Sequence, residues 1–121
     1  MKKTKGRIEA EINEAIIKFE KEYMGHGPLE AKTHIIDDLV LVRLKGVMTK
    51  AELRLASTPD NSRGRILIKE VRQELLEQGR PLLEAVVHAL TGKKIVSLHT
   101  DISTTTGERI IVFTLDAAPL E

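Results

Sequence analysis

IVSLHTDISTTTGERIIVFTL, residues 95–115, is the stretch that decides the fold. Apolar and polar residues alternate on both sides of a turn rich in threonine and glycine, a pattern typical of paired β-strands. We place these strands at 94–102 and 108–115. Successive residues of a strand point to opposite faces, so one face of the first strand carries Val96, Leu98, Thr100 and Ile102. The other face carries Ser97, His99 and Asp101.

A second hairpin is predicted closer to the N-terminus, with strands at 31–36 and 39–45. Asp37 and Asp38 form its two-residue turn, because aspartate tolerates positive φ better than most residues. The second strand begins with four apolar residues, LVLV at 39–42, which occupy both of its faces. That composition favours a central strand, or one that is covered on both sides.

The N-terminal segment 7–23 is predicted to form an amphipathic helix. Its apolar residues fall on one face at helical spacing, and glutamate and lysine occupy most other positions. Gly25 can adopt the left-handed conformation after the last turn, and Pro28 prevents continuation. The helix should therefore end just before Gly25.

A short helix is predicted at 50–57. Thr49 and Glu52 have the spacing of a capping box, in which each side chain bonds the backbone N–H of the other residue. This helix should bury Leu53, together with either Leu55 or Ala56. The residues that follow, 58–62, have the composition of a loop.

A long helical segment is predicted at 64–90, in a register marked by Gly64, Ile68, Val71, Leu75, Leu82 and Val86. As one straight helix it would be ~40 Å long, which exceeds the expected width of the domain. Pro81 would remove a helical hydrogen bond and clash with the carbonyl of Glu77. We therefore expect a break near 79–81, or a strong kink there. If the helix is unbroken, its protruding half needs a partner, most simply a second copy of the chain.

These elements predict an α+β fold in the order α-ββ-α-α-ββ. We expect a four-stranded antiparallel sheet with helices mainly on one face, in a single domain at 7–115 with flexible tails at 1–6 and 116–121. Only the two hairpin pairings follow from turn length, so the order of the strands in the sheet stays open. A homodimer is expected, because an exposed sheet edge and the long helix both gain from a second copy.

The composition excludes several classes of protein. Cysteine is absent, which excludes disulfides, thiolate catalysis and zinc sites built from cysteine. The net charge is +1, and the basic residues of the long helix alternate with glutamates, so no nucleic-acid partner is expected. No apolar run approaches the ~20 residues that span a bilayer, and no signal peptide is recognisable. We expect a cytoplasmic protein without a membrane span.

His99 and Asp101 form the first candidate site. Residues two apart on one strand lie ~7 Å apart, so a hydrogen-bonded pair could orient the imidazole as a base or a metal ligand. A metal site from His34, His99 and Asp101 would require the first and third strands to be neighbours. The alternative is a solvent-facing strand edge at which Asp101 and Ser103 set the following turn. No catalytic constellation, cofactor motif or metal-binding motif is recognisable, so no catalytic residue, cofactor or metal is predicted.

The start of the long helix is the second candidate site, for an anion or an acidic partner. Ser62 can cap the helix, whose free N–H groups favour a negative charge. The basic residues around it are Arg63, Arg65, Lys69 and Arg72. Two arginines in a first turn oppose the helix dipole and call for compensation. The alternative is an ordinary solvated face.

Several motifs together resemble one bacterial and archaeal family. They are GHGP at 25–28, the Asp37-Asp38 hairpin with VRLKG at 42–46, the Thr49 and Glu52 pair, KEVR at 69–72, HTDIS at 99–103, TGE at 106–108 and VFTL at 112–115. The chain resembles the MpsC-like family over about residues 7–115. The motif positions that the resemblance singles out are Gly25, Gly27, Pro28, His99, Asp101, Ser103 and Gly107.

The family takes its name from a component of a Na⁺-translocating system that generates membrane potential. The resemblance therefore implies a soluble accessory or regulatory protein of a membrane ion or inorganic-carbon transport system, with a membrane transport protein as partner and no catalytic role. The alternative is a sensor or enzyme for a small anion or metal, using His99 and Asp101 with the helix start at Arg63 and Arg65. Convergence of these groups in one pocket would favour the alternative.

Overall fold

The computed structural model describes residues 3–57, 59 and 62–119. The elements in chain order are α1 (Lys5–Tyr23), β1 (Glu30–Ile36), β2 (Leu39–Lys45), α2 (Lys50–Ser57), α3 (Ser62–Thr91), β3 (Ile95–Ile102) and β4 (Arg109–Leu115). The predicted α+β fold is confirmed, with both hairpins and the two shorter helices close to their expected bounds. Of the loop expected at 58–62, positions 58, 60 and 61 lie outside the described residues.

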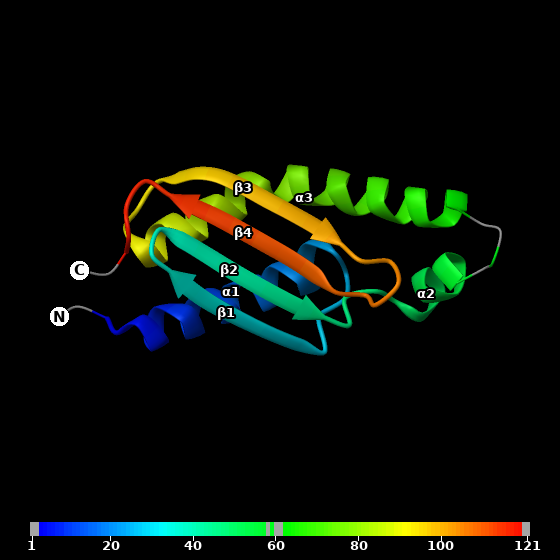
Figure 1. The fold of residues 1–121 in the computed structure, drawn as a ribbon, viewed down its shortest axis with the longest axis horizontal. Coiled ribbons are helices and arrows are strands. Elements are labelled where there is room, and N and C mark those ends of the chain that lie inside the picture. Colours follow the sequence, from blue (N-terminus) through cyan, green and yellow to red (C-terminus); the bar gives the residue numbers. More distant parts are fainter. Residues whose placement is uncertain (1–2, 58, 60–61, 120–121) are drawn as a thin grey trace.

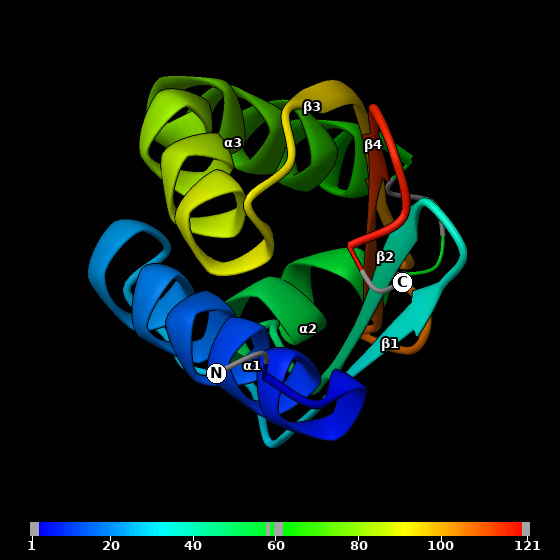
Figure 2. The same cartoon turned by 90° about the vertical axis from the view of Figure 1, so that its left-hand side faces the viewer.

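The four strands form one antiparallel sheet in the order β1-β2-β4-β3 (Figure 1). The prediction of a central β2 is therefore confirmed, and β1 and β3 form opposite edges. Figure 2 looks along the molecule and shows α1 and α3 side by side on one face of the sheet. The core lies between this helical layer and the sheet, and its largest apolar side chains include Ile12, Ile16, Leu44, Leu76, Leu83 and Phe113.

The chain reverses where the sequence predicted it would. Asp37 takes a φ of 54° in the turn between β1 and β2. Gly25 takes a φ of 76° directly after Met24, whose N–H caps α1 by donating to the carbonyl of Glu20. Both positions need the left-handed region, which aspartate and glycine enter more readily than most residues.

The outer edge of β1 is covered by side chains of α1. Glu9 accepts a hydrogen bond of 2.8 Å from the N–H of Ile35, and Asn13 donates one of 3.1 Å to the carbonyl of Ala31. The hydroxyl of Thr33 donates to Asn13 as well. Backbone groups satisfied in this way do not pair with another strand, so β1 offers little to a partner sheet.

The long helix is unbroken, so of the two alternatives predicted near 79–81, a break or a strong kink, the break is wrong. α3 runs for 30 residues with Pro81 inside it. The proline costs about 3 kcal/mol. Leu76, Leu83 and Val87 are buried on both sides of it, and each contributes about 1.5–3 kcal/mol. Burial along the whole length of the helix thus offsets the single defect.

α3 buries Gly64 and Ile68 as the sequence register predicted, but from Arg72 onward the buried positions lie one residue further along the chain. Arg72, Leu76 and Leu83 are buried, whereas Val71 and Leu82 are exposed, Val71 by 56%. The helix carries apolar residues on two adjacent stripes, and packing against α1 and the sheet selects only one of them. The unused stripe remains on the surface.

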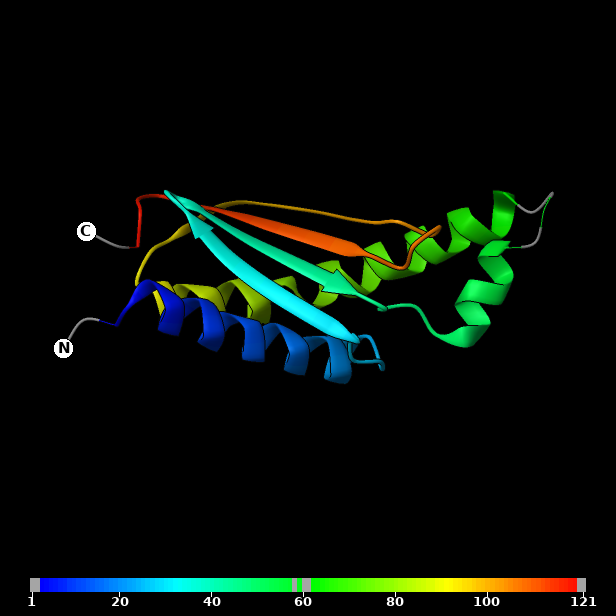
Figure 3. The same ribbon diagram turned by 60° about the horizontal axis from the view of Figure 1, so that its bottom comes forward.

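α2 and the N-terminal turns of α3 project beyond the end of the sheet, and we call this projection the α2–α3 arm (Figure 3). The capping box of α2 is present. The N–H of Thr49 donates to the Glu52 carboxylate at 3.0 Å, and the N–H of Glu52 donates to the Thr49 hydroxyl at 3.1 Å. Only Ala56 of α2 is buried, so the expectation that Leu53 would be buried is wrong. The arm has too few neighbours to cover both leucines.

A β-bulge changes the expected faces at the start of β3. Ile95 pairs with Leu115 and Ser97 with Thr114, so Val96 is an extra residue without a counterpart in β4. Ile95 and Leu98 both pack on the core, and Val96 is 64% exposed. The bulge breaks the simple alternation, and the prediction that Val96 shares a face with Leu98 is wrong.

The segments predicted as tails take part in the fold where they are described. α1 already begins at Lys5. Asp116 accepts a hydrogen bond from the N–H of Lys94 and returns one through its own N–H to the Lys94 carbonyl, at 3.1 and 3.0 Å. Positions 1–2 and 120–121 lie outside the described residues. None of the helices in the described part of the chain has the length and hydropathy that a bilayer crossing requires.

Candidate functional site

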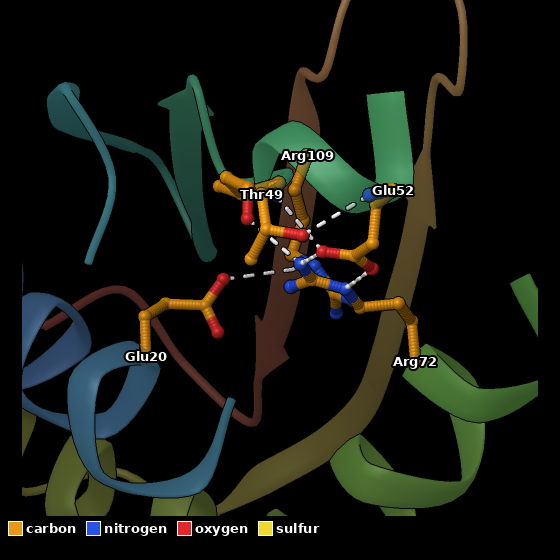
Figure 4. Close-up of polar contacts among 6 residues, drawn as sticks. Glu20, Thr49, Glu52, Arg72 and Arg109 are labelled. Carbon is orange, nitrogen blue, oxygen red and sulfur yellow. Dashed lines mark hydrogen bonds and ion pairs between the residues drawn. The ribbon is translucent and has the colours of Figure 1, made fainter. Parts of the chain in front are cut away.

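Four charged side chains meet inside the molecule where α1, α2, α3 and β4 come together (Figure 4). They are Glu20, Glu52, Arg72 and Arg109, and we call them the charged cluster. Glu20 is 0% exposed, Arg72 3% and Arg109 2%. Charged side chains are almost never fully buried unless they are paired, so the cluster is the most unusual feature of the core.

Sequence reasoning missed Glu20 and Arg109, although the apolar pattern held a signal for both. Glu20 follows Ile16 by four residues and so lies on the buried face of α1. Arg109 alternates with Ile111 and Phe113 along β4, and all three are buried. A charged residue in phase with the apolar positions of its element is a candidate for burial.

Arg72 and Glu52 form a clamp between α3 and α2. Nε of Arg72 donates to Oε2 of Glu52 at 3.0 Å, and Nη2 donates to Oε1 at 2.6 Å. Nη2 also donates to the carbonyl of Val47 at 2.7 Å. Burial acts to raise the pKa of Glu52, but the bonds from Arg72 and Thr49 outweigh it and hold the pKa below its usual value. The capping carboxylate of α2 is thus also the partner of a buried arginine.

Glu20 and Arg109 form a looser pair. Oε1 of Glu20 lies 3.7 Å from Nε of Arg109, and Nη1 of Arg109 donates to the Thr100 hydroxyl at 3.4 Å. Burial raises the pKa of Glu20, although the positive charges of Arg109, Arg72 and His26 oppose the shift. Burial also lowers the pKa of Arg109; the charge of Glu20 opposes that shift, and the like charge of Arg72 adds to it. Desolvation therefore dominates this pair.

Several polar atoms of the charged cluster are buried without a hydrogen-bond partner among the described residues. They are both carboxylate oxygens of Glu20, Nη1 of Arg72 and Nε of Arg109. A buried polar atom without a partner costs about 1–3 kcal/mol, and more when it carries charge. The cluster thus has free hydrogen-bonding capacity on both of its arginines.

A cleft of about 320 Å³ lies between α3 and β3, and Arg72 and Arg109 are among its lining residues. Lys69 and Asp101 also line it, and the Lys69 ammonium lies 3.4 Å from the Asp101 carboxylate. Both of these side chains are exposed, so the contact lies on the solvent side of the two buried arginines. The remaining lining residues are Gln73, Glu77, Leu98, His99, Thr100 and Ile102.

The structure brings together part of each predicted site. His99, Asp101, Lys69 and Arg72 all line the cleft, although they were predicted as two separate sites. Ser97 lies farther along β3, opposite Thr114. The alternative of an ordinary solvated face does not hold for Arg72, because Arg72 lies on the buried face of α3.

The start of α3 lies apart from this cleft. Ser62 is the first helical residue and is exposed, as is Arg63. Arg65 turns back toward α2, where its Nη1 donates to the carbonyl of Ala56 at 3.2 Å. The structure therefore does not bring Arg63 and Arg65 to His99 and Asp101.

The remaining motif positions lie in the connections between elements, at 25–28 and at 103–107. Gly107 takes a φ of 75°, and its N–H donates to the Ser103 carbonyl at 2.8 Å. The Ser103 hydroxyl accepts from the N–H of Thr106 at 3.2 Å. Gly25, Gly27 and Pro28 lie in the connection between α1 and β1.

The metal site considered for His34, His99 and Asp101 is wrong. His34 lies on β1, whereas His99 and Asp101 lie on β3 at the opposite edge of the sheet. Within the described ranges, no three histidine, aspartate or glutamate side chains are grouped as metal ligands would be.

Comparison with known proteins identifies a matching family and relatives in Bacillus subtilis. A family described as "Na+-translocating membrane potential-generating system (MpsC)" matches residues 4–117. The chain is 44% identical over 115 residues to "Uncharacterized protein YbcI" of Bacillus subtilis, covering 95% of this chain and 90% of that protein. It is 29% identical over 108 residues to "Uncharacterized protein YrhF" of the same organism, covering 88% and 85%. No solved structure matches it.

Proposed function

The chain belongs to the MpsC family, and from this premise we propose that it is a non-enzymatic accessory protein of a membrane ion-translocating assembly. It docks onto a transport protein of that assembly from the cytoplasmic side. The observation that carries the proposal is the α2–α3 arm, which extends beyond the sheet and exposes the apolar stripe that α3 leaves unused.

The arm has the composition of a docking surface. Large apolar side chains are exposed along it, namely Leu53, Leu55, Ile66, Leu67 and Val71. Leu67 and Val71 are four residues apart and so share one face of α3. Exposed apolar side chains that gather on one surface mark interaction sites more often than single scattered ones do. Basic side chains accompany them, among them Lys50 and Arg63, and these favour an acidic partner surface.

The charged cluster gives the arm a fixed direction. Arg72 joins α3 to the first turn of α2 through Glu52 and to the preceding segment through the Val47 carbonyl. A docking element held in its bound geometry loses less entropy on binding than a flexible one. The clamp therefore supports a role for the arm in recognition.

The test is affinity capture of the tagged chain from detergent-solubilised membranes of the source cells. A Leu67→Glu/Val71→Glu double variant places two charges in the apolar stripe. Ile36→Glu is the matched control, because Ile36 is also a half-exposed apolar residue but lies at the β1–β2 turn. We expect integral membrane transport proteins to co-purify with the wild type and the control and to be lost from the double variant.

A second copy of the chain is the competing occupant of the arm. Size-exclusion chromatography with light scattering distinguishes the two cases. A dimer that the double variant dissociates, with no membrane protein captured by any form, would contradict docking onto a transport protein. It would assign the arm to the homodimer that the unbroken α3 also favours.

The composite site that would combine His99 and Asp101 with Arg63 and Arg65 is not proposed further, because those arginines lie outside the cleft. The cleft is lined by Arg72 and Arg109 of the charged cluster.

A further inference from the structure

We propose that the cleft between α3 and β3 binds a small oxyanion, a carboxylate or a phosphate, against the guanidinium groups of Arg72 and Arg109. This site lies at the base of the α2–α3 arm and shares Arg72 with the clamp, but it does not depend on the docking proposal. It rests on three observations: unused donors on two buried arginines, a cleft that these arginines line, and a further cation on its solvent side.

Each of the two buried arginines has a donor without an acceptor. Glu52 and the Val47 carbonyl occupy Nε and Nη2 of Arg72, which leaves Nη1 without an acceptor. Nε of Arg109 is 3.7 Å from Glu20, beyond hydrogen-bond distance, and also lacks an acceptor. Guanidinium groups match the geometry of carboxylate and phosphate oxygens, so an oxyanion is the natural partner for both.

Access comes next. The cleft volume of about 320 Å³ lies at the lower end of the range for small-molecule sites. It admits a ligand of a few heavy atoms. The unpaired nitrogens of Arg72 and Arg109 are themselves closed to solvent, so binding requires the side chains around them to shift. Gln73 and Thr100 line the same space and offer an amide and a hydroxyl as further hydrogen-bonding groups.

The charges around the cleft set the size and charge of the ligand. Lys69 adds a third cation, and its exposed contact with Asp101 can be exchanged for a contact with a bound anion. Glu77 and Asp101 also line the cleft and repel additional negative charge. A small anion that reaches past them to the arginines is therefore favoured over an extended polyanion such as nucleic acid.

A closed structural pair is the competing explanation. If Glu20 moved toward Arg109 it would supply the missing acceptor, and the cleft would have no need of a ligand. The two explanations differ in the effect of Glu20→Gln. This change removes the negative charge that competes for Arg109, so anion binding in the cleft should become tighter by about threefold or more, whereas a purely structural pair gives no binding to tighten.

The experiment is a titration of the full chain with sodium phosphate and with sodium acetate, followed by amide chemical shifts in two-dimensional NMR. Sodium chloride at matched ionic strength is the reference. We expect saturable shifts confined to residues 69–77, 98–102 and 109 with at least one of the oxyanions and not with chloride. Saturation by phosphate alone assigns a phosphate, and saturation by acetate alone assigns a carboxylate.

Variants test whether the cluster residues make the site. Lys69→Ala should weaken binding at least threefold and leave the fold intact, since Lys69 is exposed. Lys18→Ala is its matched control, because Lys18 is an exposed lysine on α1 and does not line the cleft. Arg109→Lys keeps the charge but loses the planar donor set, and should weaken binding at least tenfold.

Two results would overturn the proposal. One is the absence of saturable shifts with phosphate and acetate beyond those of chloride in the wild type and in Glu20→Gln. The other is binding that Lys69→Ala and Lys18→Ala weaken equally, which would assign it to the general surface charge.

Discussion

Glu20 and Arg109 face each other at 3.7 Å in the interior, with both side chains almost completely withdrawn from solvent. Nε of Arg109 makes no hydrogen bond, and neither do the two carboxylate oxygens, so the pair gains Coulomb energy without the bonds that normally accompany it. Removing two charges from water costs several kcal/mol per ion. By this argument an apolar pair of the same size would stabilise the fold at least as well as Glu20 and Arg109 do.

Removing one partner of this pair should destabilise the protein more than removing both. We expect Arg109→Met to lower the free energy of unfolding by about 3–5 kcal/mol, because it leaves the Glu20 carboxylate buried without a cation. The double variant Glu20→Leu/Arg109→Met should return to within about 1 kcal/mol of the wild type or exceed it. Urea unfolding followed by circular dichroism measures all three. A double variant that is less stable than Arg109→Met would contradict this reading of the pair.

The raised pKa of Glu20 predicts how its contribution to stability depends on pH. The folded state favours the protonated carboxyl, so it binds a proton that the unfolded state has already released above the ordinary pKa of 4.5. The contribution of Glu20 is therefore fully present below pH 4.5 and is lost as the pH rises through the folded pKa. The positive charges of Arg109, Arg72 and His26 act to lower the pKa of this carboxyl, but burial outweighs them.

Comparison with Glu20→Gln isolates this effect, because glutamine does not titrate. The difference in unfolding free energy between the wild type and Glu20→Gln should shift in favour of the variant as the pH rises from 4.5 toward 8. Urea unfolding at several pH values measures it. A difference that shifts in favour of the wild type would show that Arg109 outweighs burial and holds the pKa of Glu20 low.

Local chemistry explains what the sequence predicted correctly. The Asp37 turn, the Gly25 stop and the Thr49 and Glu52 capping box each depend on residues within four positions of one another. Neighbours in sequence specify such features, and tertiary packing only has to permit them.

The wrong predictions concern features that are determined by contacts between segments distant in the sequence. α3 presents two apolar stripes, and only contact with α1 and the sheet selects the one that contains Arg72 and leaves Val71 exposed. The bulge at Val96 is defined by its pairing with β4. Pro81 would break an isolated helix, but burial on both sides holds the helix together. The cleft was missed for the same reason, because Arg109 and Lys69 meet only through the fold.

The clamp between α3 and α2 predicts that Arg72→Lys is not a conservative change. Lysine cannot reproduce the two bonds to Glu52 and the bond to the Val47 carbonyl at once, which should cost about 1–3 kcal/mol. Amide hydrogen exchange should accelerate in α2, because its capping residue loses an anchor. Arg80→Lys is the matched control, since Arg80 pairs with Glu84 at 3.0 Å near the surface and should change stability by less than about 0.5 kcal/mol. Equal exchange rates in α2 for both variants would show that the clamp does not hold the arm.

α1 and α3 approach each other closely at Gly79. A Cβ built on Gly79 would lie 2.5 Å from the ring of Phe19, whereas one built on Gly6 meets nothing within 4 Å. Alanine favours a helix over glycine by about 0.5–1 kcal/mol. Gly6→Ala should therefore leave the melting temperature unchanged or raise it. Gly79→Ala should lower it, because separating the two helices costs about 1–3 kcal/mol and exceeds that gain.

A second substitution shows whether the ring is the cause. Phe19→Leu removes the ring atoms that the new methyl group would meet, so Gly79→Ala should cost less in that background than in the wild type. Thermal unfolding of the four forms gives the coupling between the two positions. If the two changes were additive, or if Gly79→Ala alone raised the melting temperature, the contact between α1 and α3 would have to be looser than the structure places it.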